Sequence, residues 1–418
     1  MSRLNRIFIR YLHHKESVFL GFLILIGIVI LFISNIITIK NQQYLYLAKS
    51  FIEGHLYFTH PLKTWTDSTP FNGVHYWPLG PFPAILLTPI AAIFYNVNFP
   101  SQGLITFFCN ILNLILLYKI AKKITGNHLN SLWLAWGYIF SSAYLFIAMV
   151  PFSWYFAQVI GTTLILLSLY EYFFKKRWIL IGIYIGLAIV TRSNLALVTI
   201  FYLFIIWKST KLIKKERTES LFQLLIPVTL ALLFLLFYNY IRFGNILDNG
   251  YTRQIMDGFL FQNRKLGGLW SLVHFPSNFY YLFLKGPEGV FINGTKILTY
   301  PYLIPSYFGM SILFTSPLFL WIFKAPWKNV VVRGAVITAL IMLIFTLGLF
   351  SRGGFIQYGY RFALDFYPFL FLLLVYSVKD KVPNALKVVM VISFLINLYF
   401  ISIMFFNIQP QTIPQLMS

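Results

Sequence analysis

The sequence has 418 residues, of which 59% are apolar and only 11% are charged, which excludes an ordinary soluble domain and indicates an integral membrane protein. Its 33 lysines and arginines against 11 acidic residues give a net charge of +22, and these basic residues fall between long apolar runs. That placement favours cytoplasmic anchoring charge and argues against a nucleic-acid partner.

The N-terminal segment is basic, and the apolar stretch 18–39 that follows has about the 20 residues that a membrane crossing needs. No small-residue cleavage site follows it, so we predict an uncleaved first helix that starts in the cytoplasm. The apolar block 178–207 is interrupted by Arg192, Ser193 and Asn194, which predicts a hairpin of two short helices. The other predicted spans are 103–119, 131–149, 156–174, 221–241, 306–323, 330–350, 362–378 and 385–406.

The run 79–96 is apolar but contains Pro81, Pro83 and Pro89, which break a straight helix and suit a segment that lies at the outer interface. With this run outside the membrane, 21 of the 33 basic residues lie on the cytoplasmic side, as the positive-inside rule requires. Counting the run as a span would invert every later loop and place most of these basic residues outside.

The predicted fold is an all-α polytopic membrane protein, a single integral membrane domain over residues 1–418 with about eleven transmembrane helices. We expect it in the inner (plasma) membrane, with a cytoplasmic N-terminus and an extracytoplasmic C-terminus. Two segments on the outer side are long: the first long loop, about 40–102, and the second long loop, about 242–305. Connections in compact bundles usually have only a few residues, so these two loops are expected to be functional.

Acidic residues are few enough to be placed individually, and acid–base chemistry outside the membrane must draw on those of the outer side. Asp67 stands in a polar, turn-rich stretch, where it either catalyses or caps a turn. Glu53 lies on a short amphipathic helix ending at Gly54, where it either contacts substrate or forms part of a solvated interfacial face. The acids placed on the outer side are Glu53, Asp67, Asp248, Asp257, Glu288 and Asp365.

Basic residues on the outer side are informative because the positive-inside rule does not explain them. Arg192 lies inside apolar sequence, where a charge is either paired or functional. Arg352 and Arg361 flank a Gly-rich turn, and Asp365 follows Arg361 by four residues, so a helical ion pair is the alternative to anion binding. Arg242 is a further candidate for anion binding, or else it marks the interfacial end of its helix.

The first long loop also holds His55, His60 and His75, but their spacing does not match a metal site, and Cys109 lies inside an apolar segment. We therefore predict no metal ligand and no certain cofactor. A divalent metal stays open, because carboxylates and histidines beside a phosphate are compatible with either answer. His75, close to Asp67 in sequence, is a candidate for substrate binding.

Five sequence stretches, in one order along the chain, resemble GT-C type membrane glycosyltransferases, in particular the bacterial branch related to protein mannosyltransferases. Together they are spread over about residues 18–375. The stretches are Y-L-x-L-A-x-x-F-I-x-G-H-L (Tyr44–Leu56), N-G-V-H-Y-W-P-L-G-P-F-P-A (Asn72–Ala84), G-L-A-I-V-T-R-S (Gly186–Ser193), Y-N-Y-I-R-F-G-N-x-x-x-x-G-Y (Tyr238–Tyr251) and Q-Y-G-Y-R-F-A-L-D-F-Y-P-F-L (Gln357–Leu370).

This resemblance implies interfacial helices in the first long loop, above a cavity open to the outer leaflet, and a polyprenyl-phosphate sugar donor. It also implies that an acid of the first long loop is the general base, and Asp67 is the matching position. One departure from the family pattern concerns the residues just after the first helix, where many members have an acid. This chain has 40-KNQQ-43 there, so either Asp67 works alone, Glu53 substitutes for the missing acid, or the usual activity is lost.

Arginine suits the leaving phosphate because its planar guanidinium donates two hydrogen bonds to one oxyanion. We therefore predict donor binding by Arg192, Arg352 and Arg361, and more weakly by Arg242. The acceptor is a hydroxyl of a glycan, a lipid or a protein, and membrane lipids are the remaining partners. Two alternatives are kept: a polysaccharide polymerase or ligase, which would lack interfacial helices before the second crossing, and a lipid or solute transporter, which commonly shows inverted repeats.

Overall fold

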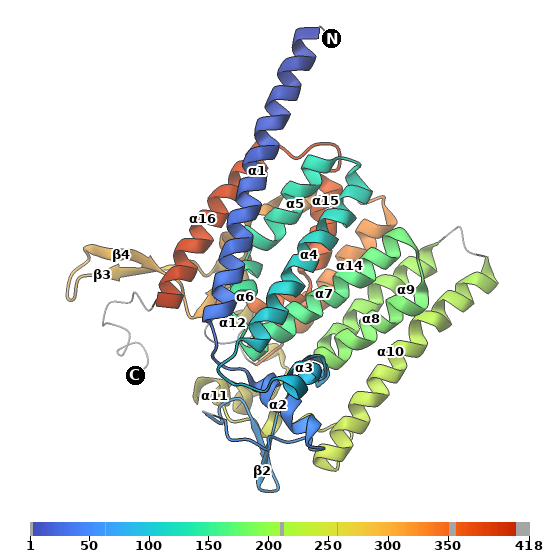
Figure 1. The fold of residues 1–418 in the computed structure, drawn as a ribbon, viewed down its shortest axis with the longest axis vertical. Coiled ribbons are helices and arrows are strands. Elements are labelled where there is room, and N and C mark those ends of the chain that lie inside the picture. The colour runs from blue at the N-terminus through green and yellow to red at the C-terminus, as the bar shows by residue number, and fades with distance from the viewer. Residues whose placement is uncertain (1–2, 63, 210–212, 257, 351–356, 407–418) are drawn as a thin grey trace.

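The computed structural model describes residues 3–62, 64–209, 213–256, 258–350 and 357–406. It is a bundle of tilted helices, with the two long loops gathered at one end, here called the loop end (Figure 1). Within the described ranges, six helices are long and apolar enough to cross a membrane. They are α1 (Arg3–Ile37), α4 (Ser101–Thr125), α7 (Ser153–Phe174), α10 (Lys214–Phe243), α14 (Val330–Leu347) and α16 (Asn384–Phe406).

The apolar block 178–207 folds into the predicted hairpin. Helix α8 (Trp178–Thr191) ends at Arg192, the 3-10 turn η1 (Ser193–Val198) follows, and α9 (Thr199–Lys208) returns. The polar residues that interrupt this block in the sequence therefore lie at the turn between the two helices. Helix α15 (Tyr367–Ser377) is also shorter than a full span, so the total of eleven crossings stays a prediction.

Three predicted spans are not continuous α-helices, and in one of them, 362–378, the 3-10 turn η6 (Arg361–Asp365) precedes α15. Residues 131–149 form α5 (His128–Phe140) and α6 (Tyr144–Met149), and the Ser142 hydroxyl accepts a hydrogen bond from the amide of Tyr144 at 3.1 Å at the break. A straight helix over 306–323 is wrong, because Ser311 caps one short helix and Pro317 begins another element. These elements are β5 (Phe308–Met310), α13 (Ile312–Thr315) and the 3-10 helix η5 (Pro317–Lys324).

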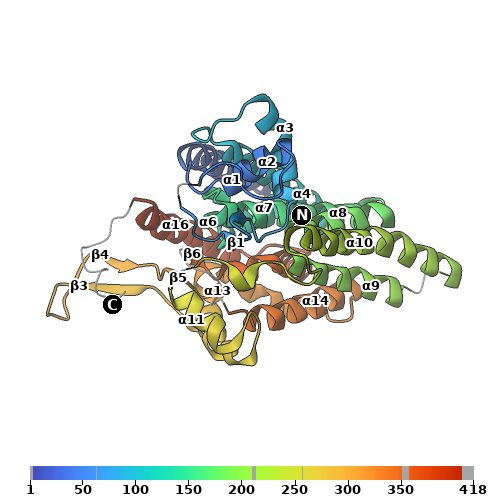
Figure 2. The same ribbon diagram turned by 90° about the horizontal axis from the view of Figure 1, so that it is seen from below.

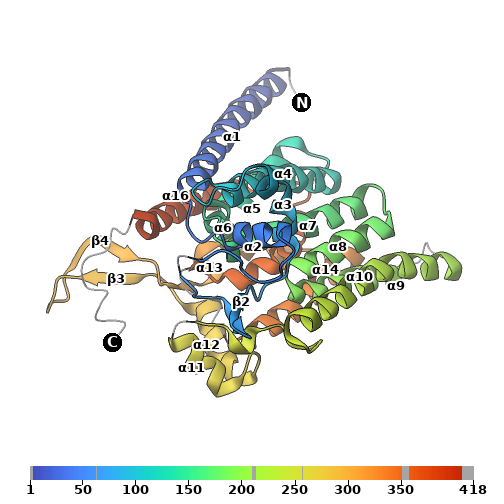
Figure 3. The ribbon, with the colours of Figure 1, turned by 60° about the horizontal axis from the view of Figure 1, so that its bottom comes forward.

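The first long loop contains interfacial helices, as the resemblance implies. Helix α2 (Gln43–Ile52) packs against α3 (Phe82–Ile93) at the loop end of the bundle (Figures 1 and 3). Twelve residues of α3 extend only about 18 Å, too short for the roughly 30 Å of hydrocarbon in a bilayer. This length supports the prediction that the run 79–96 lies at the outer interface, in agreement with the charge distribution.

The loops also contain short strands that the sequence did not indicate. In the first long loop, β1 (Thr69–Phe71) pairs antiparallel with β2 (Val74–Tyr76). In the second, β3 (Glu288–Phe291) pairs antiparallel with β4 (Leu298–Ile304), and later β5 pairs in parallel with β6 (Gln357–Gly359). The other elements of this region are η2 (Tyr251–Arg253), α11 (Gly258–Gly267), η3 (Leu272–His274), α12 (Phe275–Phe279), the π-helix η4 (Tyr280–Leu284) and, after β6, η6 (Arg361–Asp365).

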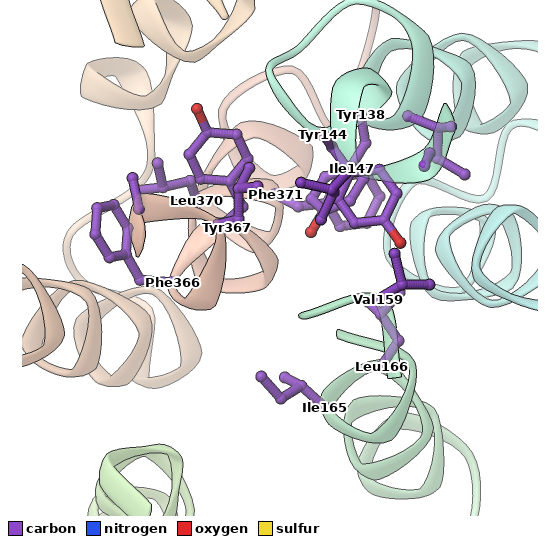
Figure 4. Close-up of a cluster of buried hydrophobic side chains, with 14 of the residues drawn as sticks. Tyr138, Tyr144, Ile147, Val159, Ile165, Leu166, Phe366, Tyr367, Leu370 and Phe371 are labelled. Carbon is purple, nitrogen blue, oxygen red and sulfur yellow. The ribbon is translucent and has the colours of Figure 1, made fainter. Parts of the chain in front are cut away.

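The core of the bundle lies where α5, α6, α7 and α15 meet. Figure 4 shows aromatic side chains of α5, α6 and α15 together with aliphatic side chains of α7. The Tyr138 ring lies 5.3 Å from that of Tyr144 and 5.5 Å, edge-on, from that of Phe371. Elsewhere the helices approach closely through a small residue, since a Cβ on Gly103 of α4 would lie 2.0 Å from the carbonyl oxygen of Asn35 in α1. Close backbone approach of this kind supplies packing energy inside a membrane.

Gly80 fixes the first long loop to the bundle. A Cβ at this position would lie 2.0 Å from the carbonyl oxygen of Val190, near the end of α8. We expect Gly80→Ala to cost about 1–3 kcal/mol of stability, because the loop must move away from α8. The measurement is the thermal unfolding midpoint in detergent. Gly21→Ala is the control, because a Cβ there meets no atom within 4 Å, and an equal effect of both substitutions would contradict the prediction.

Candidate active site

A cavity of about 870 Å³ lies at the loop end, between the two long loops and helices α7, α8, α10 and α14. Its polar part is lined by Asp67 and by three arginines, Arg192, Arg242 and Arg361. Its apolar part is lined by leucines of α10 and by residues at and after the end of α14. These apolar residues include Leu232, Leu235, Leu236, Phe345, Leu349 and Phe350. The cavity therefore combines an excess of positive charge with a long apolar wall.

Asp67 is half-buried in the wall of this cavity, and its carboxylate accepts hydrogen bonds from two other parts of the chain. The Trp154 indole Nε1, at the start of α7, donates to Oδ2 at 3.2 Å. The side-chain amide of Gln254, in the second long loop, donates to Oδ1 at 3.4 Å. Both contacts orient the carboxylate, and both donors themselves line the cavity.

The backbone at Asp67 is shaped for this position. Its φ is +69°, a left-handed conformation that Asp and Asn adopt more readily than most residues. The amide of Asp67 donates to the carbonyl of Ile255 at 2.7 Å, and the amide of Ile255 donates to the carbonyl of Ser68 at 2.9 Å. The two long loops are thus hydrogen-bonded to each other beside Asp67. The position of the Asp67 carboxylate in the cavity is therefore fixed by both loops.

Arg192 is 7% exposed and forms a buried ion pair that joins the α8–α9 hairpin to η6. Its Nη2 lies 2.8 Å from Oδ2 of Asp365, and the same oxygen accepts from Asn194 Nδ2 at 2.7 Å. Arg192 Nε is buried and has no hydrogen-bond partner among the residues that the structure describes. The Arg361–Asp365 ion pair, the alternative to anion binding by Arg361, does not form; Asp365 pairs with Arg192 instead.

Arg361 lies over the aromatic residues at the start of α7. Its guanidinium carbon is 5.8 Å from the centre of the Trp154 ring and 5.4 Å from that of Tyr155. Since Trp154 also donates to Asp67, the same indole contacts both the acid and this arginine. Two of the predicted site residues, about 300 positions apart in the sequence, therefore meet at one side chain.

Arg242, near the end of α10, is buried rather than interfacial. Its Nη1 donates to the carbonyl of Trp77 at 2.8 Å, and its Nη2 donates to Asn239 Oδ1 at 2.8 Å. The guanidinium lies 3.9 Å from the centre of the Tyr238 ring. Arg242 thus ties the first long loop to α10 while lining the cavity, so its structural and ligand-binding roles are compatible.

Of the predicted binding residues that the structure describes, two do not line the cavity. His75, on β2, stacks on Trp65 at 4.2 Å and contacts the Ser68 hydroxyl at 2.9 Å, and burial lowers the pKa of its imidazole. Glu53 lies at the end of α2 on the protein surface. Arg352 lies outside the described residues. The structure therefore brings together Asp67, Arg192, Arg242 and Arg361 but not His75 or Glu53.

Glu53 forms a surface cluster instead. Its carboxylate accepts from Thr59 Oγ1 at 2.6 Å and contacts His60 Nε2 at 3.0 Å and Lys49 Nζ at 3.3 Å. These hydrogen bonds, that from Thr59 first, lower the pKa of Glu53 from 4.5 to about 2. Glu53 is therefore explained by local pairing within the first long loop.

The lowered pKa of Glu53 makes its contribution to the stability of the fold depend on pH. Because the folded pKa is below the unfolded one, the Glu53 contribution is fully present above about pH 4.5 and is lost as the pH falls towards 2. We expect the difference in unfolding midpoint between wild type and Glu53→Gln to be constant from neutral pH to about pH 5 and to shrink below that. Thermal unfolding in detergent over this range measures it, and a difference that stays constant down to pH 3 contradicts it.

No group of three or more His, Cys, Asp or Glu side chains suitable for a metal ion occurs among the residues that the structure describes. His60 contacts Glu53, and His75 contacts Ser68, so the histidines of the first long loop face different partners. The residues that sequence reasoning missed are Trp154 and Gln254, which hold Asp67. No local pattern marks either one, because they lie 87 and 187 positions from Asp67.

No protein-family model matches the sequence, and no curated protein sequence matches it. Among solved structures, the chain is similar to ArnT from Cupriavidus metallidurans, whose crystal structure contains bound undecaprenyl phosphate. The TM-score is 0.52 at 11% sequence identity, and the match covers 91% of this chain and 63% of the ArnT chain.

At this identity the likeness concerns the fold. It shows an ArnT-like fold, in agreement with the predicted fold class, an all-α polytopic membrane protein with interfacial helices in the first long loop. The chain spans less than two thirds of the ArnT length.

Proposed function

We propose that the protein is a glycosyltransferase that moves a hexosyl or pentosyl group from a polyprenyl-phosphate donor to an acceptor hydroxyl. The observation that carries this proposal is that Asp67 faces the same cavity as Arg192 and Arg361, beside a wall of leucine and phenylalanine side chains. One cavity thus offers a base, cations for a phosphate and an apolar surface for a lipid. The undecaprenyl phosphate bound to the similar ArnT structure supports the choice of donor.

The donor fits this cavity in two parts. A phosphate fits the arginines, and the buried Nε of Arg192, which has no hydrogen-bond partner among the described residues, can donate to a phosphate oxygen. A prenyl chain fits the apolar wall, where Leu235 of α10 and Phe345 of α14 come from separate helices.

The chemistry proposed for Asp67 is general-base catalysis. Its carboxylate takes the proton of the acceptor hydroxyl while that oxygen attacks the anomeric carbon from the face opposite the phosphate. The bond from the anomeric carbon to the phosphate oxygen breaks, and the bonding electrons leave with the phosphate. The arginines stabilise the charge that develops there. One displacement of this kind inverts the configuration of the anomeric carbon.

The absence of an acid in 40-KNQQ-43 fits a role for Asp67 as the sole base. Asn41 and Gln43 line the same cavity, so this stretch is placed where an acid would act but offers only amides. Glu53 lies on the protein surface and does not line the cavity, so it is poorly placed to replace that acid as the base. We place the reaction on the extracytoplasmic side of the plasma membrane, because the charge distribution puts the loop end outside.

The test is reconstitution of the pure protein in liposomes with radiolabelled polyprenyl-phosphate sugars and candidate glycan, lipid or protein acceptors. Transfer of label to an acceptor, with release of polyprenyl phosphate, supports the proposal. Movement of an intact labelled lipid between leaflets, without transfer, favours the transporter alternative instead. Extension of a lipid-linked polysaccharide favours a polymerase or ligase, although the interfacial helices α2 and α3 argue against that class.

A further inference from the structure

We propose that the hairpin formed by β3 and β4 lies in the headgroup region of the membrane leaflet at the loop end, as a lipid anchor separate from the helices. Figures 1, 2 and 3 all show it projecting from the bundle beyond α16. It lines no part of the cavity. Its role is therefore independent of the proposed sugar chemistry.

The hairpin exposes more apolar side chains than a water-facing loop normally does. Glu288, at the base, pairs with Lys285, and Lys296, at the tip, is the only other charged residue of the hairpin. Several apolar side chains of the strands and the turn are exposed, with Ile297 63% and Tyr300 62% exposed. An exposed apolar surface of this kind marks a partner, which for a membrane protein includes the lipid itself. The exposed apolar side chains of the hairpin include Phe291, Ile292, Ile297, Leu298, Tyr300 and Tyr302.

The attachment of the hairpin sets its depth. The Tyr399 hydroxyl, in the last two turns of α16, donates to the carbonyl of Pro301 in β4. Helix α16 exposes Ile392 and Leu395 along its length, as expected of a helix that faces lipid. The apolar surface of the hairpin thus continues the lipid-facing surface of α16, at the end of that helix where the bilayer meets water.

Backbone hydrogen bonding distinguishes the headgroup region from the hydrocarbon core. In this two-stranded sheet both strands are edges, whose outward N–H and C=O groups need partners. Open edges do not occur in hydrocarbon, whereas headgroups and water at the interface satisfy them. Tyrosines such as Tyr300 and Tyr302 favour the same depth, and Lys296 can reach a lipid phosphate. In water alone, an isolated hairpin is only marginally stable.

The test places a fluorescent label at the hairpin of the full-length protein. In a Cys109→Ala background, which removes the single cysteine, Ile297→Cys is labelled with an environment-sensitive dye and the protein is reconstituted in anionic lipid nanodiscs. We expect blue-shifted emission and loss of most of it to lipids that carry a quencher near the headgroup. Lipids with a quencher deep in the acyl chain should remove less.

The control is Asn72→Cys, at the tip of the β1–β2 hairpin, whose label should emit as in water and resist both quenchers. Equal emission and quenching at 297 and 72 would overturn the proposal. Stronger quenching at 297 by the deep quencher overturns the headgroup placement. A blue shift that disappears when each nanodisc holds one protein shows contact with a second copy and also overturns it. Unchanged unfolding midpoints of the labelled variants confirm that both are folded.

Discussion

Replacing Asp67 with Asn lowers the rate of sugar transfer by about 10²–10⁴-fold, which is the usual contribution of a general base. The amide cannot take the acceptor proton, but it keeps the size of the carboxylate and one oxygen for the Trp154 hydrogen bond. Asn also tolerates the φ of +69° at this position, where Ala would be strained. The loss therefore reports on proton transfer rather than on the fold of the loop.

Two measurements make this result specific. Binding of the polyprenyl-phosphate donor should be unchanged in Asp67→Asn, because the arginines and the apolar wall remain. Glu53→Gln is the matched control, since it removes a carboxylate from the same loop at the protein surface, and it should transfer sugar at the wild-type rate. If Asp67→Asn is as active as wild type, the base is elsewhere. If Glu53→Gln alone abolishes transfer, the roles of the two acids are reversed.

Replacing Arg192 with Ala costs about 3–5 kcal/mol of stability, because it leaves the buried Asp365 carboxylate without its cation. The same substitution weakens donor binding, because Arg192 Nε is the buried donor that we assign to the phosphate. A loss of binding alone would not separate these two effects. The second variant needed is therefore one that removes the charge of both partners.

The double substitution Arg192→Met with Asp365→Leu removes both charges and fills their space with apolar side chains. It should recover most of the stability that Arg192→Ala loses, because replacing a buried pair by apolar residues is often neutral or stabilising. Donor binding should stay weak in the double variant, because no guanidinium remains at this position. Unfolding midpoints in detergent and binding of radiolabelled polyprenyl phosphate measure the two outcomes. A stable double variant that binds donor as well as wild type refutes the phosphate role of Arg192.

Much of the fold follows from the sequence because a bilayer imposes simple rules. The length of apolar runs predicts α1, α4, α7, α10, α14 and α16, and prolines together with charge exclude 79–96 as a crossing. The polar triplet at Arg192 predicts the α8–α9 hairpin. Apolarity alone cannot tell a continuous helix from a broken one, however. The segment 306–323 has the apolar composition of a span, but it is divided into short elements at Ser311 and Pro317.

The candidate site was only partly predictable. Asp67 could be singled out because acids are rare in this chain, and Arg192 because a charge in apolar sequence needs a reason. The partner of Asp365 could not be identified, since local spacing favours Arg361 while the fold brings Arg192 from 173 positions away. Trp154 carries no signal that distinguishes it from the other tryptophans expected at a membrane interface.

Composition and the spacing of apolar runs are enough to identify a polytopic membrane protein, to locate its six long apolar helices and to single out the few charged residues that need explanation. These properties depend on the free energy of transferring each segment into lipid, which composition largely sets. Which charges meet depends instead on three-dimensional packing. Asp67, Arg192, Arg242 and Arg361 come together because two loops, distant in sequence, are hydrogen-bonded to each other over the ends of helices that pack in three dimensions.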